Sequence, residues 1–385
     1  MLVNMLFAVA NNATTKDSLS TSLKSASSTE EKLEILTNLM DISRQEEQVA
    51  YAKELYKEAL ANNDDYYKEI ALTEILRFYV NNDIKDSTNV YMEEAKQELK
   101  GKARDFLVTY MQTIVDVRIV FYTEGEERKK LIEQYRLKLE TDKKLSALEK
   151  MSINYLLGMA YSNRVEPGRE NELQEMVSER FREVIALSEN MPLRYSYLFR
   201  LNSFSILTLY PQDDSEKVKY AIRYLDMQKE YAETKEMKKR PYVTKRHLLN
   251  AYSSLALSAK TLGKDIATSY YQHFMALNSQ YPEAAAFSPE YERYFTSLNF
   301  YRLIDEYPKA IKYCDSVIHY FRNSGLKIDL SEHVVSTLKD KIDMLDSLHL
   351  YKEAFYAHKE YAALLDSARL KNINDKLEDL EIQKR

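Results

Sequence analysis

Apolar side chains recur at helical spacing along almost the whole chain, in segments of roughly 13 to 20 residues. In the first segment, Leu33, Leu36 and Leu39 fall on one face of a helix, and in the second Leu55 and Ala59 do the same. Charged residues occupy the opposite faces. Each segment is therefore predicted to be an amphipathic helix with one buried face.

Consecutive segments are expected to pair into helical hairpins, because breakers such as Pro211, Gly263 and Pro282 fall between them. The expected pairs are 30–43 with 46–60, 68–80 with 86–100, 102–122 with 126–144, 146–162 with 170–188, 193–210 with 214–233, 243–262 with 265–279, 290–305 with 308–323, and 331–348 with 351–366. A unit that recurs every 35 to 50 residues or so is typical of a solenoid. We predict an all-α fold: an α-solenoid of about eight hairpins in a right-handed superhelix, followed by an extended C-terminal helix.

Composition supports this prediction. The 385 residues include only 6 glycines and 7 prolines, which turns and sheets would need in larger numbers. Apolar residues reach 45%, enough for a folded core, and charged residues make up 30%. The net charge of -5 is mild, so a nucleic-acid partner is not expected.

Particular residues resemble the tetratricopeptide repeat (TPR) family. In residues 153–161, Leu157, Gly158 and Tyr161 stand at the offsets of the first helix of such a repeat, although Asn154 replaces the usual aromatic residue. The small Gly158 would allow two helices to cross closely. The resemblance assigns repeat-packing roles to these three residues and to Leu298, Tyr301, Tyr307, Ala310, Tyr351 and Ala354. It implies a groove that binds a protein or peptide, and it leaves the groove residues unknown.

Tyrosine is abundant, with 31 residues. Most, including Tyr56, Tyr161, Tyr271 and Tyr361, fall at packing offsets and are expected in the core. A minority should face the concave side of the superhelix, where a ring with a hydroxyl group suits ligand contact.

The two ends of the chain suggest an exported sensor. Residues 1–10 end in Ala8-Val9-Ala10, which matches a signal-peptidase site, and an ordinary frayed terminus is the alternative. We expect a partial signal peptide at 1–10, a polar linker at 11–28, the repeat domain at 29–366 and a charged helix at 367–385. The segment from Tyr361 onward resembles the end of the periplasmic repeat region of Bacteroidetes-type membrane histidine kinases and related regulators.

The charged C-terminal helix carries Leu370, Ile373, Leu377 and Leu380 in one narrow stripe. Two hypotheses stay open for it, a cap on the last hairpin or a signalling helix that pairs with a second copy in a membrane-anchored form. No apolar run is long enough to span a membrane within this chain.

Motifs for catalysis or cofactor binding are missing from the sequence. Neither a dinucleotide fingerprint nor a P-loop occurs, and the six histidines form no metal-ligand spacing. The single cysteine, Cys314, is expected in the core. The basic run from Lys235 to Arg246 is interpreted as a solvated connection, with a docking patch for an acidic partner or nucleic acid as the alternative.

We therefore expect a non-enzymatic binding protein without cofactor or metal. The leading hypothesis is a periplasmic sensor region of a two-component or related signal-transduction protein. The alternative is a cytoplasmic TPR scaffold or peptide-responsive regulator.

Overall fold

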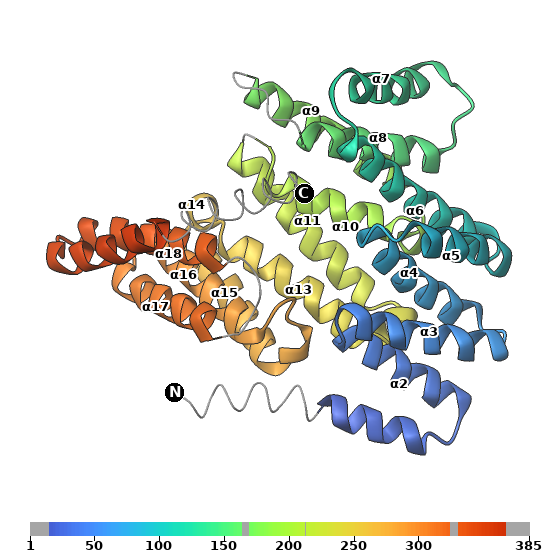
Figure 1. The fold of residues 1–385 in the computed structure, drawn as a ribbon, viewed down its shortest axis with the longest axis horizontal. Coiled ribbons are helices and arrows are strands. Elements are labelled where there is room, and N and C mark those ends of the chain that lie inside the picture. Colours follow the sequence, from blue (N-terminus) through green and yellow to red (C-terminus); the bar gives the residue numbers. More distant parts are fainter. Residues whose placement is uncertain (1–14, 164–168, 212, 324–329, 367–385) are drawn as a thin grey trace, which may run out of the picture. The chain divides into compact units, whose positions relative to one another are not determined.

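The chain is described by a computed structural model that covers residues 15–163, 169–211, 213–323 and 330–366 (Figure 1). These residues form helices joined by short connections, and no strand occurs among them. None of their helices is long and apolar enough to cross a membrane. The predicted all-α class is thus confirmed. The chain divides into two compact units, an N-terminal unit that ends at Ser254 and a C-terminal unit that begins at Leu255.

Among the described residues, the N-terminal unit begins with a helix at 15–25, and from α2 to α12 most helices pack on the next. Their bounds are α2 Thr29–Ile42, α3 Gln45–Ala61, α4 Asp65–Asn81, α5 Lys85–Glu98, α6 Gly101–Tyr122, α7 Gly125–Thr141, α8 Ala147–Ser162, α9 Glu170–Glu189, η1 Leu193–Tyr195, α10 Tyr197–Leu207, α11 Asp214–Ala232, α12 Lys235–Lys238 and α13 Pro241–Ala256. Helices α4, α6, α8 and α10 also contact one another in succession. A second, inner set of contacts therefore links alternate helices.

Polar residues at the helix starts explain where several of these elements begin. The side chain of Ser28 accepts a hydrogen bond from the backbone N–H of Glu31, and Asp64 accepts from Tyr66 and Tyr67. Ser146 and Glu149 form a reciprocal capping box at the start of α8. These side chains satisfy N–H groups that have no partner within the helix.

Two segments are more helical than the sequence pattern predicts. The stretch 11–28, expected to be a polar linker, contains the helix at residues 15–25, where Leu19 and Leu23 are partly buried one turn apart. The connection before residue 243 contains the short helix α12, and α13 begins at Pro241. Proline is tolerated at a helix start because its missing N–H would have no partner there. The expected helix 243–262 instead ends at Ala256, and α14 (Ala259–Leu262) follows it.

Gly158 lies where α8 and α9 pack against each other. A Cβ atom added to it would stand 2.9 Å from a ring carbon of Phe181. Phe181 is fully buried, and its ring meets Tyr155 edge-on at 5.6 Å between centroids. The ring has little room to move aside, so the packing of α8 on α9 depends on glycine at this position.

The C-terminal unit continues with α14, α15 Lys264–Gln280, η2 Pro282–Ala284, α16 Pro289–Leu303, α17 Tyr307–Asn323, α18 Leu330–Ser347 and a helix at 351–366. Its core includes Leu298, Cys314, Val317 and Leu338. Cys314 is fully buried, as predicted, and burial raises the pKa of its thiol to about 12. The thiol is therefore protonated at neutral pH.

We predict that Gly158→Leu lowers the free energy of unfolding by about 1–3 kcal/mol, because the new side chain must displace the Phe181 ring. Gly158→Ala should also destabilise, although alanine favours an exposed helix by about 1 kcal/mol over glycine. Urea titration measures both changes. In a Phe181→Leu background the alanine substitution should cost less, and an equal cost there would show that the ring contact is not responsible.

Candidate functional site

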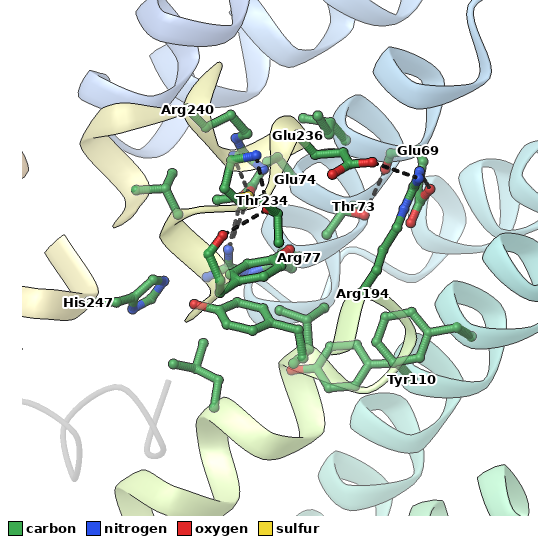
Figure 2. Close-up of a pocket in the computed structure, with 18 of the residues that line it drawn as sticks. Glu69, Thr73, Glu74, Arg77, Tyr110, Arg194, Thr234, Glu236, Arg240 and His247 are labelled. Atoms are coloured by element: carbon green, nitrogen blue, oxygen red, sulfur yellow. Dashed lines mark hydrogen bonds and ion pairs between the residues drawn. The ribbon is translucent and has the colours of Figure 1, made fainter. Parts of the chain in front are cut away.

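A cavity of about 170 Å³ lies inside the N-terminal unit (Figure 2). Helices α4, α6, α10 and α13 line it, together with η1, α12 and the end of α11. The polar lining groups are Glu69, Thr73, Glu74, Arg77, Arg194, Asn202, Thr234, Glu236, Arg240 and His247. Aromatic rings supply much of the remaining wall, namely Tyr66, Phe106, Tyr110, Tyr197 and Tyr231. Apolar walls with a few convergent polar groups are typical of a ligand-binding site.

Arg240 lies between α12 and α13 and connects elements that form the wall of the cavity. Its guanidinium group donates to both carboxylate oxygens of Asp41, with Nε and Nη2 at 3.0 and 2.6 Å, and Nη2 also lies 3.4 Å from Glu74. All three side chains are buried. Asp41 lies in the last turn of α2 and Glu74 belongs to α4, so one side chain joins segments almost 200 residues apart in sequence. Arg246 adds a hydrogen bond of 2.8 Å to the carbonyl oxygen of Asp41.

Burial and charge act in opposite directions on the two acids of this cluster. Burial raises the pKa of Asp41 above its ordinary value, and the charge of Arg240 only partly offsets this. Burial also raises the pKa of Glu74, but the charges of Arg77 and Arg240 outweigh it, so that the net pKa is lowered. Although burial disfavours the charged form, the facing acids raise the pKa of Arg240. The arginine therefore stays charged, and an ionised Glu74 faces it.

A second charged cluster surrounds Arg194 in η1. Its guanidinium group contacts Glu69 of α4 at 2.5 Å and Glu236 of α12 at 3.9 Å, and it lies over the ring of Tyr66. Tyr66 in turn donates its hydroxyl to the carbonyl oxygen of Glu236 at 2.7 Å. Figure 2 shows this cluster on one side of the cavity and Arg240 with Glu74 on the other, with Thr73 between them.

His247 borders the cavity on α13 with its Nδ1 atom buried and without a hydrogen-bond partner. Burial lowers its pKa to about 3, with further lowering by the positive charges of Arg246, Arg77 and Arg240. The imidazole is therefore uncharged at neutral pH. Its ring meets Tyr197 edge-on at 6.0 Å, and Tyr197 stacks on Tyr231 at 3.8 Å between centroids.

None of the residues that resemble a TPR motif is on the lining of this cavity, and most of them lie in packing positions. The buried ones are Leu157, Gly158, Tyr161, Leu298, Ala310 and Ala354. Tyr301 and Tyr307 are partly buried against the core of the C-terminal unit. Tyr351 departs from the expected packing role, since 64% of its surface is exposed and its hydroxyl hydrogen-bonds with His349 at 2.9 Å. Among the tyrosines expected in the core, Tyr56, Tyr161 and Tyr271 are buried, and Tyr361 is partly buried.

The interpretation of the basic run 235–246 as a solvated connection is wrong for its central residues. Arg240 is buried, and Lys239 pairs with Glu30 and Glu34 of α2 at 3.0 and 2.9 Å. The run does dock on acidic groups, but they belong to the same chain. The sequence offered one further signal: Glu69, Thr73 and Arg77 follow one another at four-residue steps and place opposite charges on one face of α4.

Among the residues that the structure describes, no group of three or more histidine, cysteine or acidic side chains could hold a metal ion. The signal peptide expected at 1–10 and the stripe from Leu370 to Leu380 lie outside the described residues. No protein-family model matches the chain, and no curated protein matches it either.

Replacing Arg240 should destabilise the N-terminal unit strongly. We expect Arg240→Met to cost about 3–5 kcal/mol in urea titration, because it leaves two buried acids without their cation. The double variant Asp41→Leu/Arg240→Met should recover part of this loss. A double variant as unstable as the single one would mean that the ion pair is not the source of the effect.

Stability should also depend on pH through His247. An unfolded histidine binds a proton near pH 6.5, whereas folded His247 does so near pH 3. The folded state is therefore favoured above pH 6.5 and loses this advantage as the pH falls from 6.5 toward 3. Between pH 7 and pH 5 the chain should lose up to about 2 kcal/mol more than a His247→Gln variant. Equal slopes for the wild-type protein and the His247→Gln variant would contradict the assignment.

Proposed function

We propose that the chain is a non-catalytic binding protein of the TPR type, and that the N-terminal unit binds a peptide or another small polar ligand in its cavity. The observation that carries the proposal is the convergence of charged, hydroxyl and aromatic groups from seven elements on one cavity. A packed core would fill such a space with apolar side chains, since uncompensated polar groups are costly to bury.

The chemistry of the cavity favours binding over catalysis. Its ionisable groups are held in ion pairs, as in the contacts of Glu69 with Arg194 and of Glu74 with Arg77 and Arg240. A general acid or base works best with a pKa near the working pH. His247, the histidine on the lining, has a pKa of about 3 and is a poor proton acceptor at neutral pH.

The wider role in our proposal is sensing within a signal-transduction protein outside the cytoplasm. Its support is the resemblance of the segment after Tyr361 to repeat-containing sensor regions, together with the Ala8-Val9-Ala10 pattern. Binding in the N-terminal unit would be the sensed event. N-terminal sequencing of the mature protein tests export, because cleavage after Ala10 is expected and an intact Met1 would contradict it.

Filling the cavity should abolish binding. Leu201 lies on the lining with part of its surface accessible, so the larger ring of Leu201→Trp should occupy ligand space. Leu209→Trp is the matched control, since Leu209 is largely exposed just after α10 and is absent from the lining. A peptide selected from a synthetic array is titrated by calorimetry. We expect affinity to fall at least about 10-fold for Leu201→Trp alone. Unchanged affinity in both variants would place binding elsewhere.

A further inference from the structure

The volume of the cavity limits the size of its ligand. About 170 Å³ corresponds to about six water molecules, because each takes about 30 Å³ in the liquid. An engineered apolar cavity of about 150 Å³ in another protein holds one benzene ring. A molecule enclosed here therefore has about six non-hydrogen atoms, and a peptide of several residues does not fit inside. Of the two ligand classes in the proposed function, the volume favours the small polar molecule.

Arg77 presents unused hydrogen-bond donors to this space. Among the described residues, only its Nη1 atom has a hydrogen-bond partner, the carboxylate of Glu74 at 3.0 and 3.3 Å. The N–H groups on Nε and Nη2 are left over. Arg77 lies on the lining, and 49% of its side chain is exposed, so these donors are accessible to a ligand. A guanidinium group with free donors favours a carboxylate, which accepts from two of them at once.

Tyr110 supplies a second unused donor on the same lining. Its hydroxyl oxygen accepts a hydrogen bond from Nδ2 of Asn202 at 2.9 Å, and in the described part of the chain its own O–H has no acceptor. Burial raises the pKa of Tyr110, and the charge of Arg77 partly offsets this, so the hydroxyl keeps its proton and lies within range of that charge. A buried O–H without an acceptor is unfavourable, and an oxygen atom of a ligand would satisfy it.

The acids on the lining are less available to a ligand than these donors. Glu74 is buried, and its oxygens already accept from two arginine side chains and one glutamine side chain. Glu69 is paired with Arg194 at 2.5 Å. Glu236 is accessible, but Arg194 lies 3.9 Å from it with 35% of its side chain exposed, and this guanidinium group would repel a ligand cation. The cavity therefore suits an anion better than a cation.

Apolar groups beside Tyr110 provide a wall for a hydrocarbon chain. The ring of Phe106 stacks on that of Tyr110 at 6.1 Å between centroids, and both rings meet Phe199 edge-on at 6.2 and 5.0 Å. Phe199 is fully buried, so the two rings are held in place. Phe106, Leu198 and Leu201 lie on the lining. A short alkyl chain would leave water when it packs against this wall.

We propose that the cavity binds a free short-chain monocarboxylate of about six non-hydrogen atoms, with its carboxylate on Arg77 and its alkyl chain against Phe106 and Leu201. Figure 2 shows Arg77 and Tyr110 at this cavity, and the Tyr110 hydroxyl is a further donor to the same ligand. The inference rests on the proposed function and names the ligand class of that site.

The test compares ligands that differ in charge or in size. Butyrate has the proposed size, butyramide has the same shape without the charge, and octanoate has a longer chain. The tripeptide Ala-Ala-Val carries the same carboxylate on a peptide. Each is titrated into the full chain and followed by NMR of the ligand, because molecules this small bind weakly. Butyrate should bind at least about 10-fold more tightly than butyramide, and octanoate and Ala-Ala-Val should bind more weakly than butyrate.

Substitution of Arg77 tests the carboxylate contact. Arg77→Gln should weaken butyrate about 10-fold and make it bind no better than butyramide. Arg136→Gln is the matched control, since Arg136 also pairs with acids of its own helix but is exposed and absent from the lining. A general loss of structure would weaken butyrate and butyramide together and leave their ratio unchanged. Should Arg77→Gln fail to fold, Arg77→Lys keeps a charge beside Glu74 and should still reduce the ratio, because the paired donors are lost.

The outcomes separate this inference from the proposed function. If butyrate does not bind, binds no better than butyramide, or binds more weakly than Ala-Ala-Val, the inference is overturned. The proposed function stands in that case, provided that Leu201→Trp still blocks binding of the peptide selected from the array. If Leu201→Trp blocks neither that peptide nor butyrate, the cavity is not the site and both conclusions fall.

Discussion

The N-terminal unit depends on the buried contact of Arg240 with Asp41 and Glu74. Elsewhere in this unit, helices pack mainly on their neighbours in sequence, and such packing alone would leave α12 and α13 far from α2. Arg240 brings these segments together with side chains, and Tyr66 and Arg194 add two further polar links to α4. A buried pair of this kind adds little net stability, because removing its charges from water is costly. Its contribution is to fix which segments meet.

The contacts of Arg240, Tyr66 and Arg194 also explain the charge pattern of the cavity. Each polar link leaves part of a charged group facing the enclosed space, as with Arg77 beside Glu74 and Glu236 beside Arg194. Asp41, Glu74 and Arg240 are buried, so their charges act over longer distances than charges at the surface do. The depressed pKa of His247 reports this positive potential together with burial. The groups that join these segments are thus among the groups that give the cavity its charges.

Local patterns were sufficient to predict most of the helices, because helical periodicity and breakers such as Pro211 and Gly263 act over a few residues. Gly158 could be singled out for the same reason. The cavity could not be found in this way. Nothing near Arg240 in sequence reveals that Asp41, almost 200 residues earlier, is its partner. A run of basic residues ordinarily favours solvent, so the pattern indicated an exposed connection where the fold buries an ion pair.

The polar character of these contacts determines how ligand binding could be transmitted through the N-terminal unit. Apolar packing is insensitive to a small polar ligand, whereas links through charged side chains respond to any ligand that competes for or bridges the same groups. A ligand that contacts lining groups of both α4 and α12 would join these helices beside the links already made by Tyr66 and Arg194. It would favour the arrangement in which these helices are in contact, because it binds that arrangement more tightly. The gain in stability is RT ln(1 + [L]/Kd), where [L] is the concentration of free ligand. The same residues would then detect the ligand and hold α4 and α12 together.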